Sequence, residues 1–113
     1  MSTPTEQDYS AGNKLIAGIV FTEQENLAAD TYYNGMPLAY EAETGVYAYS
    51  ATQFDAFYNG ATKTLASAGH GSIIVGGELY EGGMVTDANV VITMTTALRA
   101  QMRANGFYPR KVK

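Results

Sequence analysis

The segment from Asn34 to Val85 constrains the fold of this chain most strongly, because turns that contain glycine divide it into short pieces. Asn34-Gly35 and Asn59-Gly60 are turn dipeptides, since both residue types tolerate positive φ. Between them, Met36–Tyr40 and Val46–Ser50 are predicted strands, the second because of its valine, its tyrosines and its alternation. The short turn that separates them predicts a hairpin. The pattern therefore favours a mainly β structure.

The flanking segments complete the expected domain. Lys14–Phe21 is a continuous apolar run, which predicts a buried strand. Near the other end, apolar residues recur at helical spacing and predict a helix over Asp87–Ala104, with Thr86 or Asp87 as its N-cap and Asn105-Gly106 as its end. The β-branched stretch Val90–Thr96 leaves open that part of this segment is extended. We expect one α+β domain over residues 14–113, mainly β with one C-terminal helix, after a flexible polar N-terminal arm over residues 1–13.

The composition argues against chemistry that depends on clustered catalytic groups. The 113 residues include no cysteine and one histidine, His70, which lies between two glycines without the spacing of a metal ligand or a base. The paired acids Glu23/Glu25 and Glu41/Glu43 are typical of a solvated face, and the glycines do not form a phosphate loop. We expect no enzymatic activity, no cofactor and no metal.

Targeting signals are not evident either. The first residues lack the basic and apolar regions of a secretory signal, and no apolar run reaches the roughly 18 residues that a membrane helix needs. We therefore expect no contact with a membrane, and a protein that works in a cytoplasm or in an assembly built there.

Tyrosine is unusually frequent, with 9 residues of this type. Tyrosine combines apolar area with a polar tip, so it suits contacts between subunits as well as a core or a sheet surface. The residues that we consider candidates for a subunit interface are Tyr32, Tyr33, Tyr47, Tyr49, Tyr58 and Tyr80.

Charge is distributed unevenly along the chain. All 11 acidic residues lie at or before Asp87, whereas the last 15 residues carry five of the 7 basic ones. These cations could simply complement the negative end of a helix. Alternatively, Arg110, Lys111 and Lys113 could dock electrostatically on an acidic surface. Without interleaved aromatic residues they are weak evidence for direct binding of nucleic acid, which we do not expect.

The order of four segments resembles a known family. NGMPLAY, TGVYAYSA, ATKTLASAG and GGELYEGGMV follow an apolar strand and precede the predicted helix. Over about residues 15–108 the chain is similar to the head decoration proteins of tailed phages, the lambda-type capsid decoration family. The long predicted helix departs from that family's pattern.

The resemblance implies a β-clip-like small barrel and a homotrimer. Such a trimer would bind the major capsid protein on the outer surface of a mature phage head, after synthesis in the host cytoplasm. It would brace the shell against the pressure of packaged DNA. The alternative is another phage structural subunit, of the tail or of head completion, without enzymatic activity. The matching capsid-binding arm consists of Thr3, Pro4, Thr5, Glu6, Gln7, Asp8, Tyr9 and Ser10.

Overall fold

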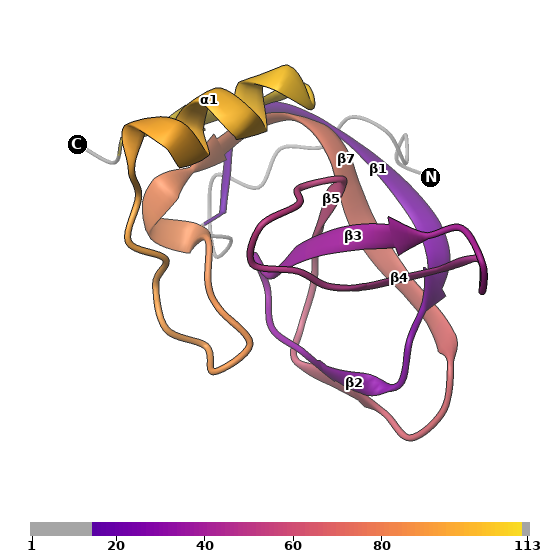
Figure 1. Ribbon diagram of the computed structural model, residues 1–113. Coiled ribbons are helices and arrows are strands. Elements are labelled where there is room, and N and C mark those ends of the chain that lie inside the picture. The colour runs from indigo at the N-terminus through magenta and orange to yellow at the C-terminus, as the bar shows by residue number, and fades with distance from the viewer. Residues whose placement is uncertain (1–14, 112–113) are drawn as a thin grey trace.

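The computed structural model describes residues 15–111 and contains mostly strands, with one α-helix near the C-terminal end (Figure 1). The predicted mainly β class with one C-terminal helix is therefore confirmed. The arm predicted over residues 1–13 lies outside the described residues. In chain order the elements are β1 (Ile16–Leu27), β2 (Asp30–Tyr32), β3 (Pro37–Glu41), β4 (Val46–Tyr49), β5 (Ala56–Tyr58), β6 (Lys63–Leu65), β7 (Gly69–Tyr80), the 3-10 turn η1 (Glu81–Gly83), α1 (Thr96–Ala104) and β8 (Phe107–Arg110).

The strands form a six-stranded sheet in the order β1-β4-β3-β5-β7-β8 and a separate small pair, β2 and β6. The long strands β1 and β7 pair antiparallel with each other as well, so the pairings run in a circuit from β1 through β4, β3, β5 and β7 back to β1. The link between β1 and β4 is the single parallel pair Leu27 and Tyr47. Figure 1 shows β1 and β7 running side by side behind β3 and β4.

The predicted hairpin is confirmed. β3 and β4 pair antiparallel, from Leu38 opposite Tyr49 to Glu41 opposite Val46. The amide of Gly45 closes the turn by donating to the carbonyl of Glu41 at 2.8 Å. Its φ of 72° belongs to the left-handed region, which glycine enters without steric cost.

The strand β1 is longer than its apolar run, because it continues through the polar residues up to Leu27. Its partner β7 begins at Gly69 and includes His70. The two strands approach very closely at Gly77, where φ is 124° and a Cβ atom would overlap the carbonyl oxygen of Ile19. Only a residue without a Cβ lets the backbones of β1 and β7 come this close.

Buried side chains form two clusters. The first joins both ends of the chain, with Phe57 between Phe54 and Phe107: its ring centroid lies 6.2 Å from the former and 4.9 Å from the latter. The second lies between β2, β3, β5 and the middle of β7. Its buried members are Leu27, Tyr32, Met36, Leu38, Ala56, Tyr58, Ile73 and Val85.

The helix is shorter than predicted, and the start at Asp87 is wrong. α1 begins at Thr96, and the hydroxyl of Thr95 caps it by accepting from the amide of Leu98 at 3.1 Å. The preceding residues turn back on the chain instead: Val91 forms an antiparallel bridge with Val85, and the amide of Ile92 donates to Met84. Their β-branched side chains favour this extended backbone.

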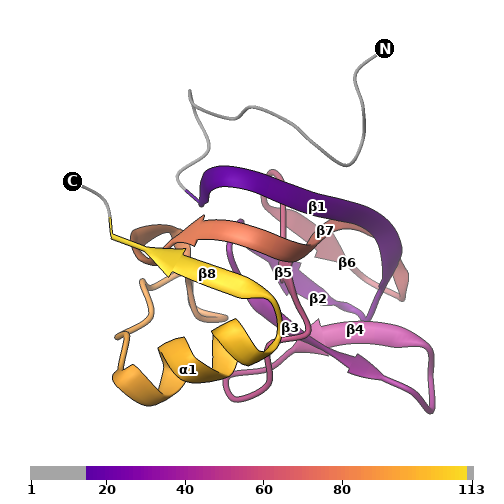
Figure 2. The ribbon, with the colours of Figure 1, turned by 90° about the horizontal axis from the view of Figure 1, so that it is seen from above.

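The predicted end of the helix is confirmed. Asn105 is the C-cap of α1, and Gly106 has a φ of 89°, which suits glycine. The chain then enters β8, which runs parallel to β7 and places Phe107 in the core opposite Gly77. Figure 2 shows β1, β7 and β8 next to one another, with α1 packed beside β8.

Candidate interaction surface

Two of the six candidate interface tyrosines belong to the core of the domain. Tyr32 is fully buried and Tyr58 nearly so, and their rings lie 5.6 Å apart. The hydroxyl of Tyr32 donates to the carbonyl of Ala28 at 2.7 Å, and that of Tyr58 donates to Ala61 at 2.7 Å. An interface role for Tyr32 and Tyr58 is therefore wrong, because both rings and both hydroxyls are occupied inside one chain.

Burial of Tyr32 makes stability depend on alkaline pH. Desolvation, together with the charges of Asp30 and Glu41, raises its pKa to about 12. In the unfolded chain the pKa of a tyrosine is near 10, about two units below that of Tyr32 in the folded chain. Folding therefore favours the protonated phenol. This stabilisation is complete below about pH 10 and is lost as pH rises towards about 12.

A Tyr32→Phe variant should show this dependence. At about pH 8 the loss of the hydrogen bond to Ala28 should cost roughly 1 kcal/mol of unfolding free energy. At about pH 11 that deficit should disappear, because the parent alone has lost roughly 1.4 kcal/mol from Tyr32. Urea unfolding of the parent and the variant at both pH values measures the deficit. The other tyrosines ionise in both proteins, so their contributions cancel. An unchanged deficit at pH 11 would show that the pKa of Tyr32 is not raised by folding.

The other candidate tyrosines are half-buried. Tyr33, Tyr47 and Tyr49 pack against the second cluster, and Tyr80 ends β7. Tyr47 also lies beside Tyr40, with ring centroids 5.2 Å apart. Burial raises the pKa of Tyr47, and the nearby carboxylates, Glu25 first among them, raise it further. Tyr47 therefore lies among acidic side chains.

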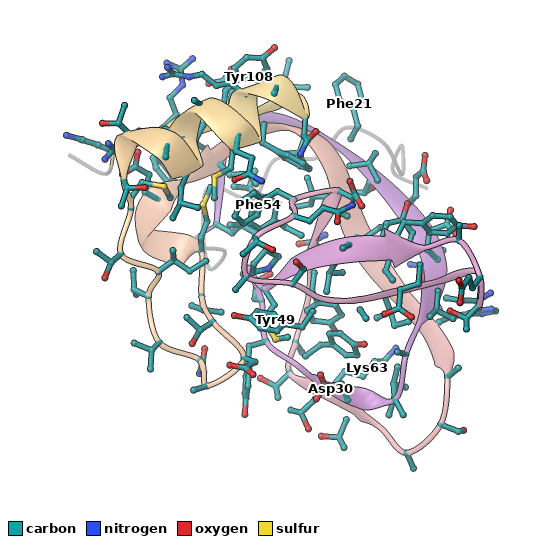
Figure 3. All side chains as sticks on the ribbon, in the orientation of Figure 1. Phe21, Asp30, Tyr49, Phe54, Lys63 and Tyr108 are labelled. Atoms are coloured by element: carbon teal, nitrogen blue, oxygen red, sulfur yellow. The ribbon has the colours of Figure 1, made fainter. Side chains whose placement is uncertain are left out.

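The outer face of the sheet formed by β1, β7 and β8 carries a more apolar surface. Val20, Gly77 and Phe107 lie in one row across these strands, and Val20 and Phe107 are fully buried. Because side chains alternate along a strand, the residues next to that row, Phe21 and Tyr108, face outward. Figure 3 shows both rings at the top of the molecule, outside the core that contains Phe54.

We use the name outer face for this surface, whose large apolar side chains are well exposed: Ile19 at 55%, Phe21 at 54% and Tyr108 at 49%. The ring of Phe21 lies beside Gly76, 3.8 Å from where a Cβ atom of that residue would be. Exposed apolar side chains that share one face of a sheet are typical of surfaces that contact other proteins. The continuous apolar run had predicted a buried strand, so the exposure of Ile19 and Phe21 corrects that prediction.

An ion pair lies on the outer face itself, because Glu78 is opposite Tyr108 on β7, the middle one of the three strands. Arg110 Nε donates to Glu78 Oε1 at 3.1 Å, and the Glu78 carboxylate lies over Gly18. Arg110, a predicted docking residue, thus forms an ion pair with an acidic residue of its own chain. Because both side chains are well exposed, the pair remains accessible and adds little to stability.

Other predicted docking residues differ in position. Lys111 is exposed directly after β8, and Lys113 lies outside the described residues. So do all the predicted arm residues, Thr3 to Ser10. Of the remaining basic residues in this end of the chain, Arg99 is held by Glu81 through two bonds, Nε to Oε2 at 2.7 Å and Nη2 to Oε1 at 3.1 Å. This bidentate contact holds the pKa of Glu81 below its usual range and ties α1 to η1.

Groups for metal chemistry are not assembled in the part of the chain that the structure describes. Within residues 15–111, no three side chains of His, Asp or Glu lie together as a metal site would require. His70 is exposed on β7, and its carbonyl accepts a bond from Lys63 Nζ at 2.7 Å. Among these same residues, no helix has the length and apolarity that a membrane crossing would demand.

The arrangement therefore offers contact surfaces: the Tyr40–Tyr47 pair beside acidic residues, and the apolar outer face, which carries the Glu78–Arg110 pair. Comparisons with family models, with curated proteins and with solved structures find no match for this chain.

Proposed function

We propose that the chain is a capsid decoration protein that binds the outer surface of a mature phage head as a homotrimer. Its partner is the major capsid protein, and its role is to stabilise the shell against internal DNA pressure. The proposal rests on the sequence resemblance, and the circuit of strand pairings supports a β-clip-like small barrel. It involves no enzymatic step, cofactor, nucleic acid or membrane.

The exposed apolar outer face is the observation that carries the oligomeric part of the proposal. Ile19, Phe21 and Tyr108 expose about half of their surface on one side of three neighbouring strands. A domain gains from covering such residues with another subunit, because aromatic residues are enriched in protein interfaces. We assign the outer face to the contact between subunits. The capsid-binding role stays with Thr3 to Ser10.

A pair of matched double variants tests the subunit contact. Ile19→Ser with Phe21→Ser should weaken trimer formation at least about 100-fold, because central apolar residues carry most interface energy. Val90→Ser with Val91→Ser removes an equally exposed apolar pair from the loop before α1, and should leave the trimer intact. Light scattering during gel filtration at several concentrations gives the masses.

The outcomes separate cleanly. A monomeric parent at micromolar concentration would overturn the trimer. If both double variants weaken the trimer equally, the outer face is not the contact between subunits. Circular dichroism of each variant shows whether its domain is still folded.

Head binding tests the decoration role separately. Purified protein should bind expanded heads and not unexpanded ones, and a variant that lacks residues 2–13 should bind more weakly while keeping its trimer. Binding to both head forms alike, or to neither, would favour a tail or head-completion subunit. Raising salt should slow association if Arg110, Lys111 and Lys113 contribute to docking.

A further inference from the structure

The chain contains the dipeptide Asn-Gly three times, at residues 34–35, 59–60 and 105–106. In this dipeptide the glycine nitrogen can attack the asparagine side chain, because no Cβ on the following residue hinders the approach. Reaction needs an asparagine side chain that can rotate onto that nitrogen, and space for a five-membered ring. The three sites share their chemistry, so the structure around each one decides which of them reacts.

A hydrogen bond joins the turn at Asn34-Gly35 to the turn at Asn59-Gly60. The Oδ1 atom of Asn34 accepts a hydrogen bond from the Gly60 amide at 3.0 Å, so one bond fixes the side chain of the first site and occupies the nucleophile of the second. Asn59 is itself only 8% exposed, and its Nδ2 lies 3.4 Å from Ser72 Oγ.

The backbone at the first site is equally constrained. The Gly35 amide donates to the carbonyl of Tyr58 at 2.8 Å, and its carbonyl accepts from Val85 at 3.1 Å. A single added carbon on Gly35 would overlap the carbonyl oxygen of Gly83. The Gly35 Cα thus packs directly against the backbone of η1, so the Gly35 nitrogen can leave its bond to Tyr58 only if this packing loosens.

Asn105-Gly106 differs in the exposure of its asparagine. Asn105 is exposed at the end of α1, whereas Asn59 is buried. The Gly106 amide donates to the Arg103 carbonyl at 3.1 Å, a bond of the last helical turn. Terminal turns open more readily than packed strands do, so this nucleophile becomes free most easily.

We propose that Asn105 is the site of spontaneous deamidation in this protein. The Gly106 nitrogen loses its proton and bonds to Asn105 Cγ, while the bond from Cγ to the side-chain nitrogen breaks and ammonia leaves. Water then opens the succinimide at either carbonyl. The products are aspartate, or isoaspartate with one extra carbon in the main chain.

The modification falls at a sensitive junction. It adds a carboxylate at the C-terminal end of α1, where the helix dipole disfavours negative charge. An isoaspartate would also lengthen the link between α1 and β8, where the Gly106 carbonyl accepts from Gly77 at 3.0 Å and Phe107 enters the core. The reaction is therefore a chemical route by which this end of the domain loosens with age.

Peptide mass spectrometry of one incubated sample compares the three sites directly. The folded protein is kept warm at mildly alkaline pH, digested, and scored for the mass gain of an amide converted to an acid. We expect Asn105 to react at least roughly tenfold faster than Asn34 or Asn59, a ratio that corresponds to about 1.4 kcal/mol of barrier. A methyltransferase specific for isoaspartate should label the same peptide, and Asn105→Gln should abolish that label.

The same incubation in urea is the control for sequence context. There the three rates should converge, because only the fold distinguishes the sites. The proposal is overturned if Asn34 or Asn59 reacts as fast as Asn105 in the folded chain. It is also overturned if the full rate advantage of Asn105 persists in urea.

Discussion

Replacing Gly35 with alanine should destabilise the domain by about 3 kcal/mol or more. Gly35 has a φ of 93°, which a residue with a Cβ adopts only with strain, and that Cβ would overlap the Gly83 carbonyl oxygen. The obstacle is backbone, so relief would require η1 to move. The neighbouring Met84 is fully buried in the first core cluster, which makes such movement costly.

Gly45→Ala is the matched control. Gly45 also has a positive φ, 72°, yet a Cβ there would meet nothing within 4 Å. Its cost should be limited to backbone strain, roughly 1 kcal/mol. Urea unfolding of both variants separates close packing from strain, and equal losses would show that Gly35 does not pack against η1 as described.

The local elements of the fold were predictable from the sequence because neighbouring residues determine them. The hairpin of β3 and β4 follows from two short alternating strands and a turn glycine. The end of α1 follows from Asn105 and Gly106 for the same reason. In each case the residues that form the contacts lie within a few positions of one another.

Long-range pairing explains what the sequence did not reveal. β1 and β7 are far apart in the sequence, and their register depends on two irregularities and on the close approach at Gly77. One irregularity has extra residues in β1 and the other an extra residue in β7. These irregularities also make it hard to assign faces along Lys14–Phe21. Hence the sequence predicts Ile19 and Phe21 in a buried run, whereas both are exposed in the structure.

The helix start and the tyrosines show the same limit. Val90 and Val91 fit helical spacing, but the bridge between Val91 and Val85 keeps them extended and exposed. Tyr32 and Tyr33 are adjacent in sequence, and only the pairing of Tyr32 with Lys63 in β6 places the first in the core and the second at its edge. Composition alone could not separate core tyrosines from surface ones.

Phe57→Ala should cost about 3–5 kcal/mol of unfolding free energy, because it leaves a cavity that the surrounding side chains cannot fill. Phe57 is fully buried, and its ring contacts Phe54 on one side and Phe107, edge-on, on the other. It thus connects β5 to β8, and its loss should also loosen the attachment of α1. Urea unfolding measures the cost, and hydrogen exchange of the β8 amides tests the loosening.

Phe21→Ala is the matched control, since it removes the same side chain from the outer face, where Phe21 is 54% exposed. In a dilute monomer this change should cost less than about 0.5 kcal/mol. If the outer face is buried between subunits, the cost of Phe21→Ala should grow with protein concentration, because association then contributes to stability. The cost of Phe57→Ala reflects a cavity within one chain and should not follow concentration in the same way. A cost for Phe21→Ala that matches that of Phe57→Ala even in the dilute monomer would mean that Phe21 belongs to the core, and the outer face would lose its role as a contact surface.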